Sequence, residues 1–281
     1  MTPVYKISGS INTDYSGYKQ LCDFYHYCKD FQNTVIHIDF YELKWVDANL
    51  AAVFYAMINK LHEELNIGFS TDFAFLRSNF DILFRNGFLT DGLPADDIQK
   101  SAVPIERFSC EDKTGFCNYI KDQLMRHRGM PWLSPELEEQ IQEDLLEIFC
   151  NSNFHANTKD PFFIAGQYYP KLKTLKLTMV DTGDGFLPKI QQVTHGKINT
   201  DLEAIGWALE GKSTKLALEK TPGSLGISSI LKYVKKHNGV LEIISGSGYW
   251  SSSFDNILIY KKGRVLEKPF VGTTINLFFR Q

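Results

Sequence analysis

The chain has 281 residues, a formal net charge of -3 and 43% hydrophobic residues, enough to bury a core in one large or two smaller domains. No segment approaches eighteen consecutive apolar residues, and the start MTPVYKISGS lacks a basic stretch followed by an apolar one. We therefore expect neither a membrane span nor an export signal. The five cysteines are dispersed and without metal-ligand spacing, which indicates thiols in the reducing cytoplasm.

The charge is unevenly distributed along the chain. Residues 1–150 carry 13 Lys and Arg against 23 Asp and Glu, whereas residues 151–281 carry 17 against 10. A basic second half suits a pocket for a triphosphate, and it would also suit nucleic acid. Because no run of basic residues exceeds two, we do not expect nucleic-acid binding.

The first third of the chain predicts a small α/β unit. Residues 34–40 (TVIHIDF) are typical of a buried strand, and residues 48–65 place apolar side chains at helical spacing. A second strand near 71–76 and a short helix near 79–86 complete a β-α-β-α order, which favours parallel pairing. Residues 91–103 then have the Gly, Pro and Asp content of a linker.

The remainder predicts a second α/β unit. A strand is expected at 104–109 and an amphipathic helix at 113–127. Ser134 and Pro135 then provide an N-cap and a first-turn proline, so a long helix begins there. The alternating residues 172–181 (LKTLKLTMVD) predict another strand.

Two polar residues on the long helix could act on a phosphate. Glu147 and Asn151 are four residues apart and therefore share a helix face. A carboxylate can activate a water or a hydroxyl, and an amide oxygen can bind Mg²⁺. The same pair would also suit an ordinary solvated face, so it becomes informative only beside a second element.

That second element follows the strand at 172–181, where Asp181, Gly183 and Gly185 lie in the sequence DTGDG. Glycines let the backbone approach a flat ring, and a buried aspartate can accept a hydrogen bond from an exocyclic amine. Adenine offers such an amine. An ordinary tight turn is the alternative interpretation of the same five residues.

Together these residues resemble the GHKL superfamily, the ATP-binding fold shared by gyrase B, Hsp90, sensor histidine kinases and MutL. The N-box of that family, E-x-x-x-N-x-x-x-H-A, is matched by Glu147, Asn151, His155 and Ala156. Its D-x-G-x-G box is matched at 181–185. The resemblance implies that Asp181 binds the adenine amino group, Asn151 holds magnesium and Glu147 is the base.

Two further segments resemble later motifs of the same family. TPGSLGISSI (221–230) is similar to the box in which a lid ends and a helix begins with its amides turned to the phosphates. The nucleotide-binding residues implied there are Gly223, Ser224, Leu225 and Gly226. FVGTTINLFF (270–279) is similar to the last motif, which implies that Gly272 and Thr273 lie near the adenine.

The chain departs from the family pattern at the position of the lysine that would bind the phosphates. Sensor kinases often have a lysine three residues after the N-box asparagine, and Phe154 stands there instead. We therefore look to the expected lid, residues 187–221, where Lys212, Thr214 and Lys215 are candidates. The glycines around this segment suggest that the lid closes over bound nucleotide.

The N-terminal unit weakly resembles the STAS fold of bacterial anti-sigma-factor antagonists. In those proteins a strand enters a D-S-x-G turn before a helix, and residues 46–49 (VDAN) occupy that place here. The serine that is phosphorylated in the antagonists corresponds to Ala48, which has no hydroxyl. The resemblance therefore does not imply a phosphorylation switch, and a plain docking or dimerisation module is the alternative.

A P-loop is a competing interpretation of the nucleotide site. Gly206 to Ser213 (GWALEGKS) satisfies G-x-x-x-x-G-K-S and would make Lys212 indispensable. However, a P-loop follows a buried strand, whereas the residues before Gly206 are polar and favour a helix.

We thus predict an α/β protein with a STAS-like domain (1–92), a linker (93–103) and a GHKL-type domain (104–281) in which helices cover one face of a mixed sheet. The expected function is that of a bacterial, cytoplasmic Mg-ATP-dependent switch that hydrolyses ATP or transfers its phosphate. An anti-sigma-like serine/threonine kinase and a non-catalytic nucleotide sensor stay open. ATP, magnesium and a protein partner of the N-terminal domain are expected, with a homodimer as an open alternative.

Overall fold

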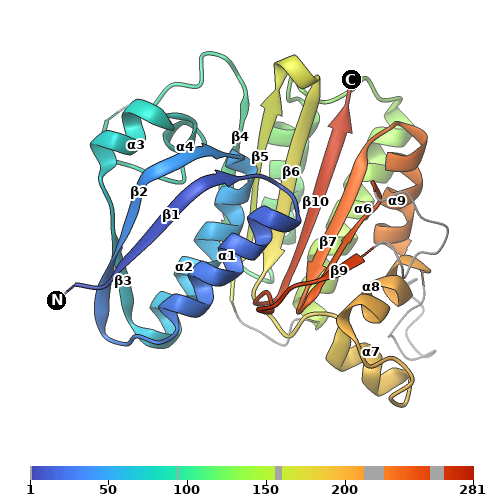
Figure 1. The fold of residues 1–281 in the computed structure, drawn as a ribbon. Helices are drawn as coiled ribbons and strands as arrows, with labels where there is room; N and C mark the ends of the chain where they lie inside the picture. The colour runs from blue at the N-terminus through green and yellow to red at the C-terminus, as the bar shows by residue number, and fades with distance from the viewer. Residues whose placement is uncertain (1, 94, 156–159, 212–224, 254–262) are drawn as a thin grey trace.

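The computed structural model describes residues 2–93, 95–155, 160–211, 225–253 and 263–281, with side chains other than those of residues 152–155 and 225. These residues form helices and two sheets, which confirms the predicted α/β class (Figure 1).

The N-terminal unit contains a three-stranded parallel sheet in the order β1-β2-β3. Its elements in chain order are β1 (Val4–Ile11), α1 (Tyr15–Cys28), β2 (Thr34–Val46), the 3-10 turn η1 (Ala48–Leu50), α2 (Ala51–Leu65), β3 (Ile67–Ser70), α3 (Phe73–Asn79) and α4 (Ile82–Arg85). The sequence patterns predicted β2, α2 and a helix near α4, but neither β1 nor α1.

The strand expected at 71–76 is wrong. The strand β3 has already ended at Ser70, and Asp72 caps a helix instead, because its Oδ1 accepts the Phe75 N–H at 2.9 Å. An aspartate at this position satisfies an otherwise unpaired amide of the first helical turn. The aromatic residues that suggested a strand therefore belong to α3.

The second unit contains a seven-stranded sheet in the order β4-β5-β6-β10-β7-β8-β9. Its elements are β4 (Ala102–Phe108), α5 (Lys113–Tyr119), the π-helix η2 (Ile120–Met125), α6 (Pro135–His155), β5 (Phe162–Tyr169), η3 (Pro170–Leu172), β6 (Thr174–Asp181), α7 (Leu187–Val193), α8 (Asp201–Leu209), α9 (Leu225–Lys236), β7 (Val240–Ser245), β8 (Gly248–Ser251), β9 (Gly263–Val265) and β10 (Thr273–Arg280).

Every pairing in this sheet is antiparallel among the described strands, so the expected mixed sheet is wrong. Short connections join β5 to β6 and β7 to β8, and short connections enforce antiparallel neighbours. The last strand, β10, inserts between β6 and β7 and runs antiparallel to both.

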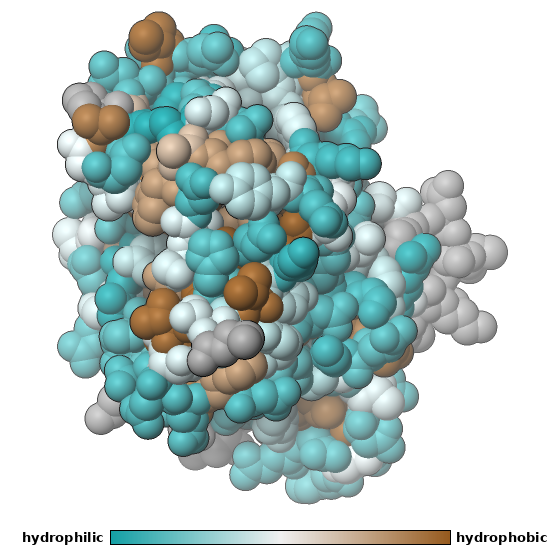
Figure 2. All heavy atoms as spheres, turned by 60° about the vertical axis from the view of Figure 1, so that its left-hand side comes forward, coloured by the Kyte–Doolittle hydropathy of each residue, from teal (hydrophilic) through white to brown (hydrophobic). Residues whose placement is uncertain are grey.

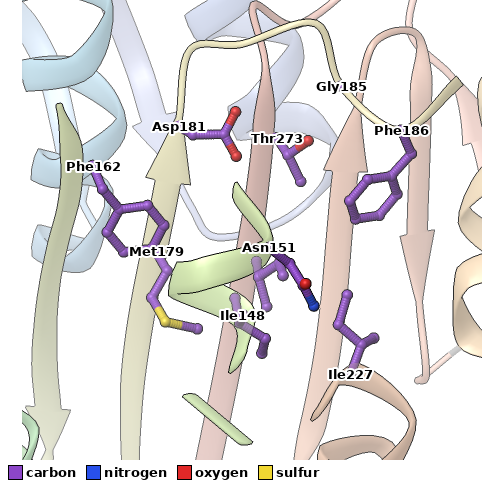
Figure 3. Close-up of a pocket in the computed structure, with 10 residues that line it drawn as sticks. Ile148, Asn151, Phe162, Met179, Asp181, Gly185, Phe186, Ile227 and Thr273 are labelled. Carbon is purple, nitrogen blue, oxygen red and sulfur yellow. The ribbon is translucent and has the colours of Figure 1, made fainter. Parts of the chain in front are cut away.

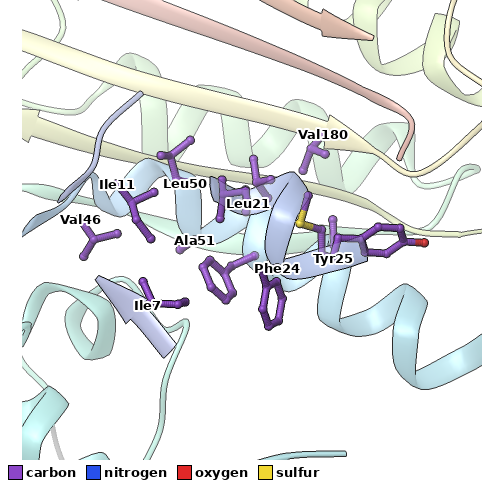
Figure 4. Packing of buried hydrophobic residues seen from close by; sticks show 14 of the residues in the cluster. Ile7, Ile11, Leu21, Phe24, Tyr25, Val46, Leu50, Ala51 and Val180 are labelled. Atoms are coloured by element: carbon purple, nitrogen blue, oxygen red, sulfur yellow. The ribbon is translucent and has the colours of Figure 1, made fainter. Parts of the chain in front are cut away.

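The elements are stacked in layers, with helices between the two sheets and further helices outside the larger one (Figure 1). One face of the seven-stranded sheet packs on α5, α6, α8 and α9 through Phe149, Met179 and Ile230. The opposite face packs on α1, η1 and α2, and Leu21 of α1 and Leu50 of η1 belong to the same buried cluster as Val180 of β6 (Figure 4). The N-terminal unit therefore supplies the helical cover of the second face.

Buried hydrogen bonds also join the two units. Asn49 Nδ2 donates to Thr178 Oγ1 at 2.7 Å, and Thr178 Oγ1 donates to Asn276 Oδ1 at 2.8 Å. Lys176 Nζ donates to Asp47 Oδ2 at 2.6 Å. Burial alone would raise the pKa of Asp47, but the adjacent Lys176 ammonium brings that pKa below its usual value. The turn at 46–49 is thus enclosed between the two units.

Candidate nucleotide site

A pocket lies on the face of the seven-stranded sheet that packs on α6 and α9, between these helices and the ends of β6 and β10 (Figure 3). Its cavity measures about 40 Å³ and continues into open solvent. Four of the predicted site residues line it: Asn151, Asp181, Gly185 and Thr273.

Asp181 is the last residue of β6, an interior strand, and its side chain is held at the end of that strand. It is 8% exposed, and its Oδ1 accepts the Gly183 N–H at 3.0 Å. Burial raises the pKa of Asp181 to about 7, although hydrogen bonds from the Gly183 and Thr273 backbones act in the opposite direction. This carboxyl group therefore titrates close to neutral pH.

Two glycines beside Asp181 allow the backbone to close around it. Gly185 has φ +75°, and a Cβ there would lie 2.7 Å from Ser245 Oγ. Gly272 has φ +102°, and a Cβ there would lie 2.1 Å from the Asp181 carbonyl oxygen. Both positions combine left-handed backbone with a close contact, so only glycine fits without rearrangement. Gly272 also brings Thr273 into register opposite Asp181.

The helix α6 brings Asn151 to the pocket from the other side. Ser134 Oγ accepts the Leu137 N–H at 3.3 Å at the start of this helix. Farther along, Leu145 and Phe149 are fully buried against the sheet, which fixes the helix rotation. The Asn151 side chain projects into the pocket below Asp181 and Thr273 (Figure 3).

Glu147 lies one turn before Asn151 and is partly buried. Asn151 Nδ2 donates to its Oε1 at 3.4 Å, and the Gly226 N–H donates to its Oε2 at 2.8 Å. Gly226 is in the first turn of α9, where N–H groups and the helix dipole favour negative charge. The Glu147 carboxylate therefore lies between α6 and the end of α9 at which a phosphate would be favoured.

The close approach of the two helices depends on Gly226. A Cβ at this position would lie 2.8 Å from the Asp144 carbonyl oxygen and 3.1 Å from Glu147 Cβ. Asp144 itself is buried on α6, and burial raises its pKa to about 6. Asp144 carries no distinguishing local signal in the sequence, because it is one acidic residue among many on this helix.

The apolar walls of the pocket were also missed as site residues. Ile148, Met179, Phe186 and Ile227 line the pocket around the polar groups (Figure 3). Ile148 and Met179 occupy ordinary core positions in the sequence pattern, so periodicity cannot separate them from the rest of the core. Phe186 had the clearer signal, since it directly follows the DTGDG segment.

A partly buried ion pair connects the pocket edge to the N-terminal unit. Lys60 Nζ of α2 lies 2.8 Å from Asp160 Oδ2, and Thr182 Oγ1 donates to the same oxygen at 2.8 Å. Thr182 is adjacent to Asp181. Asp160 therefore links helix α2 to the residue that follows Asp181. No sequence pattern within either unit predicted this link.

Several predicted residues lie outside the described part of the chain. These are Lys212, Thr214, Lys215, Gly223 and Ser224, together with Ala156 of the N-box. Leu225 begins α9, but its side chain is outside the description, as are those of Phe154 and His155.

The described structure around Gly206 does not have the strand that a P-loop requires. Gly206 lies inside helix α8, which begins with a capping box formed by Thr200 and Glu203. A P-loop requires a strand before its first glycine, and a helix precedes this one. Lys212 and Ser213 lie outside the described residues.

Magnesium is compatible with this donor set. Within the described residues, no group of three or more His, Cys, Asp or Glu side chains is placed so that it could hold a metal ion. Mg²⁺ usually takes few ligands from a protein and the rest from phosphates and water, so one amide oxygen beside a triphosphate is sufficient. The Asn151 amide lies in the pocket and meets this requirement.

No helix in the described ranges is both long and apolar enough to cross a bilayer. Comparisons of the chain with models of protein families, with curated proteins and with solved structures give no match.

Proposed function

We propose that this protein binds Mg-ATP in the pocket between α6, α9 and β6, and acts as a regulatory protein of the GHKL type. It would hydrolyse ATP or transfer its phosphate to a protein partner, and use the nucleotide as a switch. The observation that carries the proposal is that Asn151 and Asp181 line one pocket together with Gly185 and Thr273.

The base would bind at the Asp181 end. The ionised carboxylate accepts a hydrogen bond from the exocyclic amine of adenine. The neighbouring Met179 and Ile148 side chains offer apolar contact to the ring faces. Gly185 and Gly272 keep the backbone close enough for the base to lie deep beside the carboxylate.

The phosphates would extend toward the start of α9. Asn151 would hold the magnesium ion, which neutralises charge on the phosphate oxygens when it is bound. Glu147 lies beside the first turn of α9 and would accept the proton of the attacking water or hydroxyl. Its present hydrogen bond to Gly226 would have to be exchanged when phosphates arrive.

The test substitutes Glu147→Gln, with Glu143→Gln as the matched control. Glu143 is exposed one helical turn earlier on the same helix. Glutamine keeps a hydrogen-bond acceptor for the Gly226 N–H but cannot take a proton. We expect ATP turnover to fall about 10²-fold or more while ATP affinity changes by less than roughly threefold. Equal turnover of the native chain and both variants would contradict the role of Glu147.

A non-catalytic nucleotide sensor is a second candidate function, and the contact between Glu147 and Gly226 favours it. The Glu147 carboxylate accepts a backbone N–H at 2.8 Å, so it is engaged in structure rather than aimed at solvent water. This candidate predicts that the native chain binds ATP without turnover, even with candidate protein partners added.

A serine/threonine kinase acting on another protein stays within the main proposal. Transfer to the chain's own turn at 46–49 is not favoured, because Ala48 is fully buried and its N–H donates to Gln167 Oε1 at 2.8 Å. We further propose a cytoplasmic protein whose partner contacts the N-terminal unit, with a second copy of the chain as the alternative.

A further inference from the structure

A second pocket lies in the N-terminal unit, between β2, α2 and α4. Its cavity measures about 110 Å³, and the described residues that line it are hydrophobic except for Ser70 and Thr71. Five phenylalanines contribute to the wall: Phe40, Phe54, Phe69, Phe73 and Phe88. The proposed nucleotide site does not use this pocket, because the two share no lining residue.

The pocket arises where the three-stranded sheet stops. The strand β2 continues to Val46, whereas β3 pairs with it only as far as the register of His37 with Ser70. Asp72 then starts α3, so the chain leaves the sheet and the second half of β2 pairs with β1 alone. The space between that half, α2 and α4 is left without a strand to fill it.

Such a cavity is unusual for a folded core. Protein interiors are close-packed, and voids larger than a water molecule are few. An engineered apolar cavity of about 150 Å³ stays dry and binds benzene. A cavity of about 110 Å³ with an apolar wall is therefore of the size that admits a single ring or a short alkyl chain.

The two polar side chains of the wall are already engaged. Thr71 Oγ1 donates to the Ile38 carbonyl oxygen at 2.9 Å, and Ser70 Oγ lies 3.2 Å from His37 Nδ1. Water or a charged group would find few partners inside, and burying an unpaired charge is costly. The pocket therefore selects against charged ligands.

The pocket also reaches the surface. Phe73 is 38% exposed, so one side of the wall is in contact with solvent. Hydrophobic side chains appear on the molecular surface at the level of α3 and α4, on the face that the N-terminal unit presents (Figure 2). A ligand can thus enter without global unfolding, and any longer tail can remain outside.

We propose that this pocket is a binding site for an uncharged small molecule that inserts a phenyl ring or a short alkyl group among the five phenylalanines. Aromatic walls add edge-to-face contacts to the gain from burying apolar surface, which favours a ring as the inserted group.

The experiment titrates the full chain with toluene and follows isoleucine methyl signals by NMR. We expect saturable shifts at Ile11, Ile38 and Ile58, which line this pocket, and none at Ile148 or Ile227 of the nucleotide pocket. Benzylamine carries the same ring with an ammonium group, and we expect it to bind at least about tenfold more weakly. Absence of saturable shifts, or equal binding of benzylamine, would overturn the proposal.

A variant that fills the pocket provides a second test of the proposal. Ile58→Trp adds bulk to the pocket from a partly buried position, whereas Ile105→Trp adds it at a partly buried position of β4 outside the pocket. Toluene binding should be lost in the first variant and kept in the second, with the Ile148 and Ile227 signals unchanged in both. Retained binding in Ile58→Trp would show that the ring binds elsewhere and would equally overturn the proposal. Neither test involves ATP.

Discussion

At the residue scale, Asp181 determines how the proposed nucleotide pocket should respond to pH. Burial raises the pKa of its carboxyl group to about 7, and the ionised carboxylate is a stronger acceptor for an adenine amine than the protonated acid. At pH 6 only about a tenth of the free protein has this group ionised, whereas at pH 8 about nine-tenths does. Binding of the base should therefore weaken as the pH falls through 7.

We predict that adenosine affinity falls about tenfold between pH 8 and pH 6. Adenosine is the appropriate probe because it has no phosphate that titrates in this range. Calorimetric titration across the range measures the effect, and Asp181→Asn, which cannot ionise, should abolish it together with most of the affinity. A flat profile in the native chain would show that Asp181 does not bind the base as an anion.

At the element scale, the junction of β10 with β6 shapes the pocket. A Cβ on Gly272 would lie 2.1 Å from the Asp181 carbonyl oxygen, and the residue has φ +102°. Gly272→Ala should therefore destabilise the fold by about 3 kcal/mol or more and displace Asp181. Gly196→Ala is the control, since Gly196 has φ +75° but no atom within 4 Å of its Cβ position, and should cost about 1 kcal/mol. Urea unfolding compares the two, and equal losses would contradict the steric argument.

The elements with strong periodicity could be predicted from the sequence. The helices α2 and α6 and the strand β6 follow regular apolar patterns, and Ser134 and Pro135 mark the start of α6. The strand β1 was missed because Lys6, Ser8, Gly9 and Ser10 interrupt its apolar pattern. The helix α1 was missed because Tyr and Cys residues form much of its buried face, and these residues carry little helical signal.

The site could be predicted only in part. Local spacing identified Glu147, Asn151 and Asp181 separately as candidate site residues. The resemblance to the GHKL superfamily grouped them into one expected site. Their actual proximity depends on the packing of α6 against the sheet and on β10 pairing with β6, which are long-range contacts without a local signal. The apolar wall at Met179 and Ile227 could not be separated from the core for the same reason.

At the scale of the whole molecule, the two units share one hydrophobic cluster. Phe163, Val180 and Ile244 of the seven-stranded sheet belong to the same cluster as the buried residues of α1 and α2. Glu242 lies on the same side, with Tyr249 Oη donating to its Oε1 at 2.8 Å and Asn276 Nδ2 donating to its Oε2 at 3.2 Å. Removal of the N-terminal unit would expose this face to solvent.

We therefore predict that a fragment of residues 102–281, which keeps the whole of β4, does not fold into a stable monomer. The exposed apolar face should cause aggregation, because large contiguous apolar patches favour association. The full chain, in contrast, should unfold in one cooperative transition. Size-exclusion chromatography and thermal circular dichroism compare the two chains, and a monomeric fragment with its own cooperative transition would contradict the shared core.

The most direct test of the nucleotide pocket is titration of the native chain with Mg-ATP while methyl NMR signals of isoleucine and methionine are followed. The pocket described above predicts saturable shifts at Ile148, Met179, Ile227 and Ile275, which line it. The methyl signals of Ile11 and Ile38 in the N-terminal pocket should not move with the same affinity. If Mg-ATP produces no saturable shift at the first group of residues, the assignment of this pocket to a nucleotide is wrong.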